Sequence, residues 1–185
     1  NPLYYKLRKK IIKRDSIKNI LISFGGTDPH NITSIAMNAL NKISSINKIT
    51  IILNKLSSNF DKIQKLVESN KRIELIENQY NLANYYYRAD LSIGASGFSS
   101  WERCYLGLPT VVITTADNQK FISEKLVKTK SIILCSDYKN VTSKKIENCV
   151  NEIIIDNKIG TMSSSALKTF SSFRIDEILA KDLGI

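Results

Sequence analysis

The stretch "SIGASGFSSWERCYLGLPTVVITTADNQ" spans residues 92–119 and carries the pattern that decides the fold. It begins in an apolar segment, turns at two glycines among small residues, and continues into a helix-like segment that contains Glu102. A second apolar run, TVVITT, follows and leads directly into ADNQ. A strand, a polar turn, a helix and another strand in this order form the βαβ unit of a parallel sheet.

The same alternation continues in both directions along the chain. Short β-branched runs predict strands, and apolar residues at helical spacing predict helices between them. We expect strands at residues 19–24, 49–53, 73–76, 91–93, 110–114 and 132–134, and helices at 32–43, 60–67, 82–86, 101–106, 121–126, 146–154 and from 163 onward. The pattern predicts an α/β fold, a Rossmann-like doubly wound parallel sheet. In such sheets, ligands bind beyond the carboxyl ends of the strands, where the strand order reverses.

The composition is that of a globular protein. The chain has 185 residues, of which 43% are hydrophobic and 24% are charged, and this fits one folded domain, or one domain with an appendage. No apolar run approaches the roughly 20 residues that span a bilayer, so we expect no stable membrane insertion. Residues 1–16 lack an initiator Met and the apolar core of a signal peptide, so we expect a domain cut from a longer protein.

The net charge is +10, from 27 Lys and Arg against 17 Asp and Glu. Because the lysines are scattered along the chain, the excess favours a solvated basic surface over a nucleic-acid or membrane interface. We expect no nucleic-acid partner, whereas anionic small molecules remain compatible ligands. Cys104, Cys135 and Cys149 lie in apolar segments without C-x-x-C spacing, so we interpret them as buried thiols in a reducing, cytoplasmic compartment.

The first strand end, SFGGTDPHNIT at residues 23–33, places Gly25 and Gly26 after a strand and Thr27, Asp28 and Pro29 before a helix. Glycines let the chain turn sharply and let a ligand approach the backbone, and free amides at a helix start favour an anion. The pattern is neither a Walker A loop nor G-x-G-x-x-G. The same residues also suit an ordinary capped turn, so this junction alone leaves both interpretations open.

The second strand end, GASGFSSWE at residues 94–102, has the composition of a phosphate-binding turn. Its small residues allow a narrow turn, and Ser99 and Ser100 add hydroxyls to the amides of the next helix start, which suits a phosphate or diphosphate. Glu102 follows within the first helical turn, where it could accept hydrogen bonds from two sugar hydroxyls. The alternative is a helix start with serine caps and a stabilising glutamate.

The third strand end, TTADNQ at residues 114–119, offers Asp117, Asn118 and Gln119. These side chains suit hydroxyl or acetamido groups in the same crevice, although Asp117 or Asn118 could equally cap the next helix. His30 is the sole histidine. With no nucleophile evidently paired to it, we interpret it as a capping or surface residue rather than a general base. No carboxylate or histidine cluster has metal-site spacing, so we expect no metal and no cofactor.

Three motifs together resemble a known family. ILISFGGTDPHNIT at residues 20–33, ADLSIGASGFSSWERCYLGLPTVVI at 89–113 and ADNQ at 116–119 are similar, in order and spacing, to the C-terminal half of the nucleotide-sugar hydrolases of pseudaminic acid biosynthesis and of related spore-coat polysaccharide proteins. They are more distantly similar to the UDP-GlcNAc transferase that makes lipid II. The interval from Gly97 to Glu102 is one residue shorter than in the transferase pattern and carries Trp101, which favours the hydrolase.

The resemblance implies the C-terminal half of a GT-B architecture, in which two Rossmann-like domains face each other across a cleft. Residues 1–16 would connect to an N-terminal domain, 17–160 would bind the nucleotide sugar, and 161–185 would form a helical tail. The implied partners are a UDP-sugar and the chain's own N-terminal domain, which would hold the water-activating histidine. The implied UDP-binding residues are Gly25, Gly26, Thr27, Gln79, Tyr80, Ser96, Gly97, Phe98, Ser99, Ser100 and Glu102, and the implied sugar-binding residues are Asp117, Asn118 and Gln119.

Four functions remain open at this point. The leading expectation is an enzyme that hydrolyses a UDP-diacetamido-trideoxyhexose: water attacks the anomeric carbon while helix-start amides stabilise the departing UDP. The second is a GT-B glycosyltransferase with the same UDP site. The third is a nucleotide-sugar binding module without chemistry. The fourth is nucleic-acid binding driven by charge, which would show a steep salt dependence.

Overall fold

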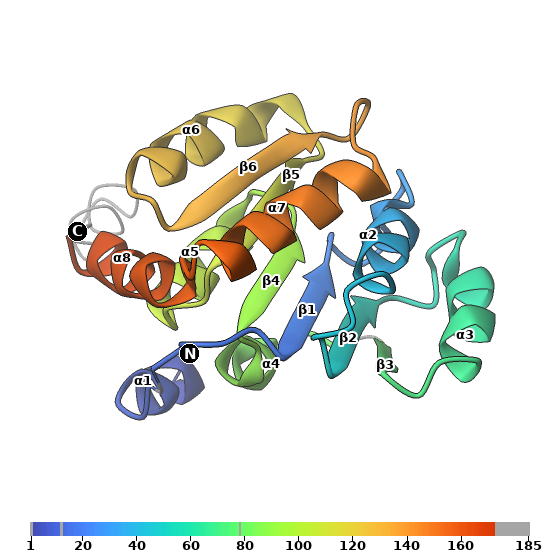
Figure 1. The fold of residues 1–185 in the computed structure, drawn as a ribbon, viewed down its shortest axis with the longest axis horizontal. Coiled ribbons are helices and arrows are strands. Elements are labelled where there is room, and N and C mark those ends of the chain that lie inside the picture. Colours follow the sequence, from blue (N-terminus) through green and yellow to red (C-terminus); the bar gives the residue numbers. More distant parts are fainter. Residues whose placement is uncertain (1, 12, 78, 173–185) are drawn as a thin grey trace.

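The computed structural model describes residues 2–11, 13–77 and 79–172. Within them, six parallel strands form one sheet in the order β3-β2-β1-β4-β5-β6 (Figure 1). The strands are β1 Asn19–Ser23, β2 Lys48–Leu53, β3 Ile73–Glu77, β4 Leu91–Gly94, β5 Thr110–Thr114 and β6 Ile132–Asp137. The helices are α1 Pro2–Arg8, α2 Ile32–Leu40, α3 Phe60–Glu68, α4 Ala83–Arg88, α5 Phe98–Tyr105, α6 Lys120–Lys128, α7 Ser143–Ile155 and α8 Ile159–Ser172, with a 3-10 turn η1 at Asp117–Gln119. The expected Rossmann-like doubly wound sheet is confirmed.

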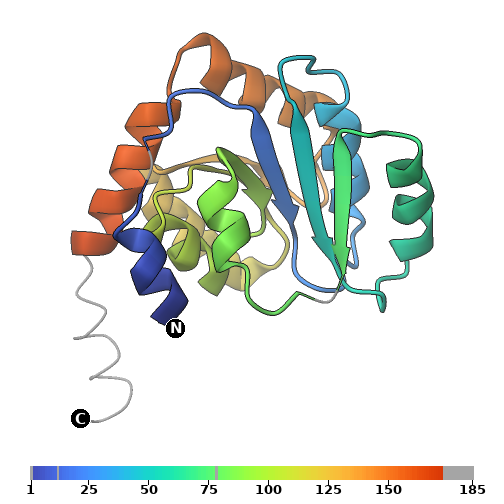
Figure 2. The ribbon, with the colours of Figure 1, turned by 90° about the horizontal axis from the view of Figure 1, so that it is seen from below.

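The sheet is covered on both faces because consecutive strand side chains point in opposite directions. In β1, Ile20 and Ile22 join a core with α2, α3 and α7, whereas Leu21 between them packs with α4. A third cluster joins Val112 of β5 to α5, α6 and α8. Figure 1 shows α2 and α7 in front of the strands, and Figure 2 shows α1 beside α4. Burial on both faces explains why the strands are continuous apolar runs.

Several elements differ from the expected bounds. Helix α5 begins at Phe98 rather than at residue 101, because Gly97 is extended and its carbonyl already accepts the Ser100 amide at 2.9 Å. Strand β6 continues to Asp137, three residues beyond its expected end. The helix at residues 2–8 was not expected. The tail is helical through Ser172, and the part of the expected C-terminal helix after that residue lies outside the described residues.

Arg14 joins the N-terminal segment to the rest of the domain. Its side chain is only 6% exposed, and each of its five N–H donors reaches a carbonyl oxygen near the end of α4 or α5. The acceptors are Ala89 at 2.9 Å, Leu106 at 3.0 Å, Gly107 at 2.9 Å, Tyr86 at 3.1 Å and Tyr87 at 3.3 Å. The guanidinium therefore caps two helix C-termini at once, where a positive charge is favoured. Burial lowers the pKa of Arg14 to about 10.

The strand order reverses between β1 and β4, which are adjacent although two other strands separate them in sequence. Ser23 pairs with Gly94 at the carboxyl end of this strand pair. A Cβ atom at Gly94 would lie 2.6 Å from the carbonyl oxygen of Ser23, so only glycine allows the strands this approach. From here the chain departs to opposite faces, into α2 after β1 and into α5 after β4. A crevice at this point is where such sheets hold ligands.

Candidate functional site

Two of the three predicted junctions meet at the switch in strand order, and the third follows the next strand along. Residues 24–31 leave β1 and residues 95–97 leave β4, and these two strands are hydrogen-bonded neighbours. Residues 115–119 leave β5, the other neighbour of β4. The carboxyl ends of parallel strands lie at one edge of the sheet, so the fold brings these polar segments together as expected.

In the first turn, the backbone at Gly25 has free space beside it, whereas the amides at the start of α2 are already hydrogen-bonded. Gly25 has φ +86°, which favours glycine, and no atom lies within 4 Å of where its Cβ would be. Asp28 is buried, and its two carboxylate oxygens accept the amides of Ile32 at 3.0 Å and Thr33 at 2.8 Å. Of the two interpretations left open for this junction, the helix start follows the capped turn, because Asp28 accepts the Ile32 and Thr33 amides that an anion would otherwise bind.

The second turn is built differently. Gly97 donates its amide to the Ser100 hydroxyl at 3.4 Å, which closes the turn before α5. Ser96 is fully buried at 0% exposure, and its hydroxyl has no hydrogen-bond partner among the described residues. Phe98 is exposed at the beginning of α5, and Ser99 is half-buried. The turn thus combines small residues, hydroxyls and a helix N-terminus, with no acidic side chain in the first turn of α5.

Arg103 lies against this turn and is a residue that the sequence prediction missed. Its side chain is 1% exposed. Its Nη2 donates to the Ala95 carbonyl at 2.6 Å and to the Ser100 hydroxyl at 3.0 Å, and its Nη1 reaches the Ser99 hydroxyl at 3.5 Å. Ser99 and Ser100 stand four and three residues before Arg103, so helical spacing was the signal that could have found this contact.

Glu102 is held by the N-terminal segment. The hydroxyl of Tyr4 in α1 donates to Glu102 Oε1 at 2.9 Å. Burial, reinforced by Glu102, raises the pKa of Tyr4 well above its usual range, so the phenol stays a donor. A carboxylate has about four lone-pair sites, so Glu102 keeps acceptor capacity for other hydroxyls. The half-buried carboxylate is therefore oriented and still able to accept.

Among the described residues, the third junction has two polar side chains with hydrogen-bond or ion-pair partners, Asp117 and Gln119, and one amide side chain without a partner, Asn118. Asp117 is exposed and pairs with Lys120 at 2.8 Å, an interaction that lowers the pKa of Asp117. Gln119 turns back, so that its Oε1 accepts the Thr115 amide at 2.9 Å. Asn118 is exposed between them. In this structure Gln119 braces the junction, and Asn118 is the side chain available to a ligand.

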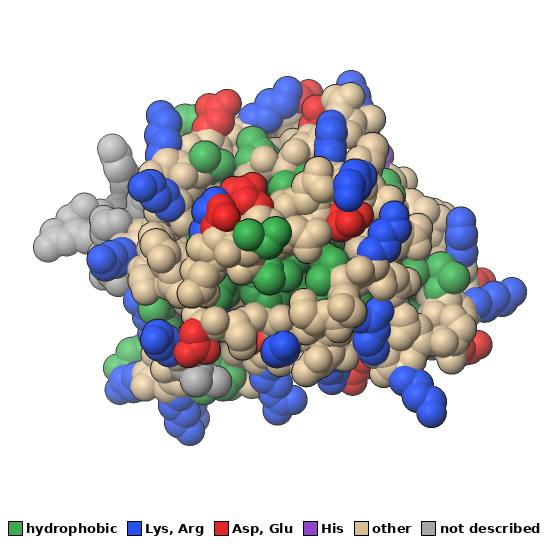
Figure 3. Space-filling model, viewed as in Figure 1, with side chains coloured by type: hydrophobic (Ala, Val, Ile, Leu, Met, Phe, Trp, Pro, Cys, Tyr) green, Lys and Arg blue, Asp and Glu red, His purple; other side chains and the backbone are tan. Residues whose placement is uncertain are grey.

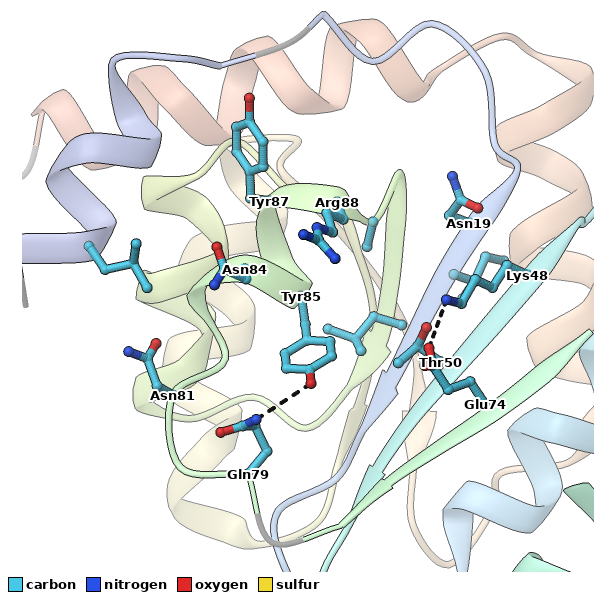
Figure 4. A pocket seen from close by; sticks show the side chains of 14 residues that line it. Asn19, Lys48, Thr50, Glu74, Gln79, Asn81, Asn84, Tyr85, Tyr87 and Arg88 are labelled. Atoms are coloured by element: carbon cyan, nitrogen blue, oxygen red, sulfur yellow. Dashed lines mark hydrogen bonds and ion pairs between the residues drawn. The ribbon is translucent and has the colours of Figure 1, made fainter.

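Gln79 and Tyr80 lie farther from the switch than the other predicted residues. They follow β3, and β2 and β1 stand between that strand and β4. Gln79 points into a groove of about 720 Å³ beside α4, where its Nε2 donates to the Tyr85 hydroxyl at 3.4 Å (Figure 4). The groove floor carries the cross-strand ion pair of Lys48 and Glu74 at 2.7 Å. Tyr80 is 93% exposed.

His30 is exposed and stacks on Tyr138, with ring centroids 3.9 Å apart and planes inclined by 20°. This contact joins the first turn to the segment after β6 and fits the expected surface duty. Within the described ranges, no group of three or more His, Cys, Asp or Glu side chains could hold a metal ion. The same residues include no helix long and apolar enough to cross a bilayer.

The basic side chains are dispersed on the visible face. Figure 3 shows Lys and Arg spread over this face, with acidic side chains among them. The described surface ion pairs include Lys55 with Glu77 at 2.8 Å and Lys158 with Glu152 at 2.7 Å. The three cysteines are free thiols; Cys104 is buried, and Cys135 and Cys149 are half-buried.

Comparison with known proteins identifies the family. The Glycosyltransferase family 28 C-terminal domain matches residues 20–177. Spore coat polysaccharide biosynthesis protein SpsG of Bacillus subtilis is 22% identical over 121 residues, which are 64% of this chain and 36% of SpsG. A UDP-N-acetylglucosamine–N-acetylmuramyl-(pentapeptide) pyrophosphoryl-undecaprenol N-acetylglucosamine transferase of Rickettsia bellii is 34% identical over 101 residues, 51% of this chain and 28% of the transferase.

A solved structure agrees with the fold. The structure of HepE of Anabaena in complex with UDP and glucose has a TM-score of 0.67 and 18% sequence identity, and it covers 99% of this chain and 52% of HepE. The chain thus spans only 36% of SpsG and 28% of the Rickettsia transferase.

The prediction that this chain belongs to a hydrolase is wrong. The matching family is that of a glycosyltransferase domain, and relatives with a named activity are transferases. The short interval between Gly97 and Glu102 was therefore not a reliable sign of hydrolase activity. The chain belongs to the glycosyltransferase family 28 C-terminal domain family.

Proposed function

We propose that this chain binds the sugar donor of a GT-B glycosyltransferase and that the donor is a UDP-sugar. The observation that carries the proposal is the pairing of Ser23 with Gly94, which sets the Gly25–Gly26 turn beside the serine-rich turn of α5. A diphosphate needs backbone amides and hydroxyls without an acidic neighbour, and the start of α5 has this composition.

The site residues have the following proposed roles. The turn of residues 96–100 holds the diphosphate, and Glu102 accepts hydrogen bonds from the ribose hydroxyls. Gly25, Gly26 and Thr27 border the diphosphate from the side of β1. Asn118 meets the sugar, with Asp117 and Gln119 as its neighbours. Gln79 and Tyr80 approach the uracil from the loop after β3.

The chemistry of transfer explains why this half would bear the leaving group. When the acceptor attacks the anomeric carbon, the bond from that carbon to the diphosphate oxygen breaks and negative charge develops on the departing UDP. Amides and the dipole at the start of α5 would stabilise that charge. The acceptor and the base that deprotonates it would belong to the N-terminal domain, so this chain is proposed to contribute binding and charge stabilisation.

An N-terminal domain is the proposed partner. Exposed aromatic rings follow three carboxyl strand ends: Tyr80 after β3, Phe98 after β4 and Phe121 after η1. Large exposed apolar side chains gathered at one edge suit a ligand or a second domain. The N-terminal segment, with Tyr4 on Glu102, would connect that domain to the donor site.

Calorimetry of residues 1–185 tests the proposal. We expect UDP to bind more tightly than UMP, because the second phosphate meets the α5 turn, and more tightly than CDP, because of the base. Equal heats for UDP and CDP would contradict a uridine site. No heat with any nucleotide diphosphate, from protein shown by circular dichroism to be folded, would contradict the donor-binding function itself.

A further inference from the structure

A buried positive charge, that of Arg103 in α5, lies against the turn that precedes this helix, and the donor-binding proposal gives it no role. Arg103 is 1% exposed, and within the described residues no carboxylate lies within ion-pair distance of it. The neighbouring carboxylate, Glu102, is engaged with Tyr4. A buried guanidinium without a counter-ion is costly, so such an arrangement calls for a compensating anion.

The position of the charge is set by the switch point. A Cβ atom at Gly94 would lie 3.0 Å from Arg103 Nη1 as well as 2.6 Å from the Ser23 carbonyl oxygen. The guanidinium therefore sits beside the paired ends of β1 and β4, between the sheet and the turn of α5. Glycine at position 94 is what makes room for it.

Two buried polar groups at this place lack partners. The Nε of Arg103 has no acceptor, and the hydroxyl of Ser96, fully buried in the same turn, has no hydrogen-bond partner among the described residues. Buried polar atoms are paired in the great majority of cases, so unpaired ones at one turn indicate that the described residues do not fully compensate the charge of Arg103. The remaining donors of Arg103 hold Ala95 and Ser100 and thus shape the turn.

We propose that Arg103 is the positioning residue for the donor's diphosphate: it shapes the turn of residues 95–100 and supplies the positive charge that attracts the two phosphates. The inference rests on the proposed donor-binding function and adds a residue to it. Because Arg103 is buried, it acts through the turn and through its field rather than by touching the phosphates. Its charge is little screened by solvent there.

The test compares UDP with uridine, which share base and ribose and differ in the diphosphate. In Arg103→Gln, UDP affinity should fall at least 10-fold, whereas uridine affinity should stay within 2-fold of the parent. Arg103→Lys keeps the positive charge but loses the planar guanidinium with its fixed donors, so its UDP affinity should lie between those of Arg103→Gln and the parent. The matched control is Arg88→Gln, which removes one exposed positive charge from the adjacent α4 and should change UDP affinity less than 2-fold.

The outcomes separate the two proposals. If the parent does not bind UDP, the donor-binding function fails. If the parent binds UDP and Arg103→Gln binds it equally well, or loses UDP and uridine to the same extent, the role of Arg103 is refuted. Should Arg103→Gln not fold, Arg103→Lys carries the test, because it alters the contacts with the turn and leaves every proposed phosphate-binding residue in place. That variant should weaken UDP about 3-fold and leave uridine unchanged, and unchanged UDP affinity would overturn the inference.

Discussion

Replacing Arg14 should be among the most damaging single changes to the fold, although Arg14 lies before the first strand. Its five hydrogen bonds join residues 86–89 at the end of α4 to residues 106–107 at the end of α5. Arg14→Ala removes the donors and leaves those carbonyl oxygens in a space from which water is largely excluded. Unpaired buried carbonyls cost free energy, whatever replaces the arginine.

The magnitude follows from opposing effects. A hydrogen bond to a charged group contributes about 1.5–3 kcal/mol, so five would give an unrealistic upper bound, since they share one cation and are not additive. Removing the guanidinium also removes its desolvation cost, which is several kcal/mol. Breaking such a buried arrangement destabilises proteins by about 3–5 kcal/mol, and we expect this loss in the free energy of unfolding. For a chain of this size, Tm should fall by roughly 6–20 °C.

Urea denaturation of residues 1–185, followed by circular dichroism, measures this loss. Arg14→Lys supplies three donors instead of five, so it should lose about half as much stability as Arg14→Ala. Lys13→Ala, at an exposed neighbouring position, should stay within about 0.5 kcal/mol of the parent. An unfolding free energy for Arg14→Ala within about 1 kcal/mol of the parent would refute the reasoning, because it would show that the five hydrogen bonds contribute little net stability.

Three further predictions concern the site and its support. Glu102→Gln should weaken UDP binding in calorimetry by about 1.5–3 kcal/mol, because it loses charged hydrogen bonds to the ribose; unchanged affinity would leave Glu102 only as the partner of Tyr4. In a full-length protein with the proposed transferase activity, Asn118→Ala should reduce UDP-sugar turnover while inhibition by UDP stays the same, and equal losses would place Asn118 at the nucleotide instead. Burial raises the pKa of Tyr86 from 10.0 to about 12, so the neutral phenol is favoured in the fold. The parent's free energy of unfolding should therefore fall by an amount on the order of 2–3 kcal/mol between pH 10 and pH 12, because the unfolded chain loses the Tyr86 proton first. Urea unfolding of Tyr86→Phe should not show this part of the pH dependence.

The fold could be predicted because its signals are local. Strands buried on both faces leave continuous apolar runs such as residues 110–114, and polar segments after them mark the carboxyl edge. Right-handed crossovers then restrict the possible strand orders. The end of α5 could be predicted, but its start could not, because Phe98 is exposed and two serines follow it. Those residues indicate a loop unless the Gly97 geometry is known.

The site could be predicted only in part, because burial of polar side chains is a tertiary property. Asp28 looked like one member of a ligand-binding turn, and the structure uses it to occupy the start of α2. Arg103 is a charged residue within a short amphipathic helix, a position that the sequence alone assigns to the solvated surface. Its burial depends on contacts with Gly94, Ala95 and Ser100. Helical spacing in the sequence can predict the serine contact but not the contacts with Gly94 and Ala95.

The two turns at the switch point differ in charge, and this difference orients the proposed donor. Asp28 places a carboxylate at the start of α2, so an added anion there would meet a like charge with no free amide from Ile32 or Thr33. Arg103 places against the start of α5 a buried cation that has no ion-pair partner among the described residues. Under the proposed donor-binding function, a diphosphate shared between the turns would be drawn toward α5, and the first turn would contribute the open backbone at Gly25. A sugar attached to that diphosphate would then be expected to lie toward the junction after β5, where Asn118 is exposed.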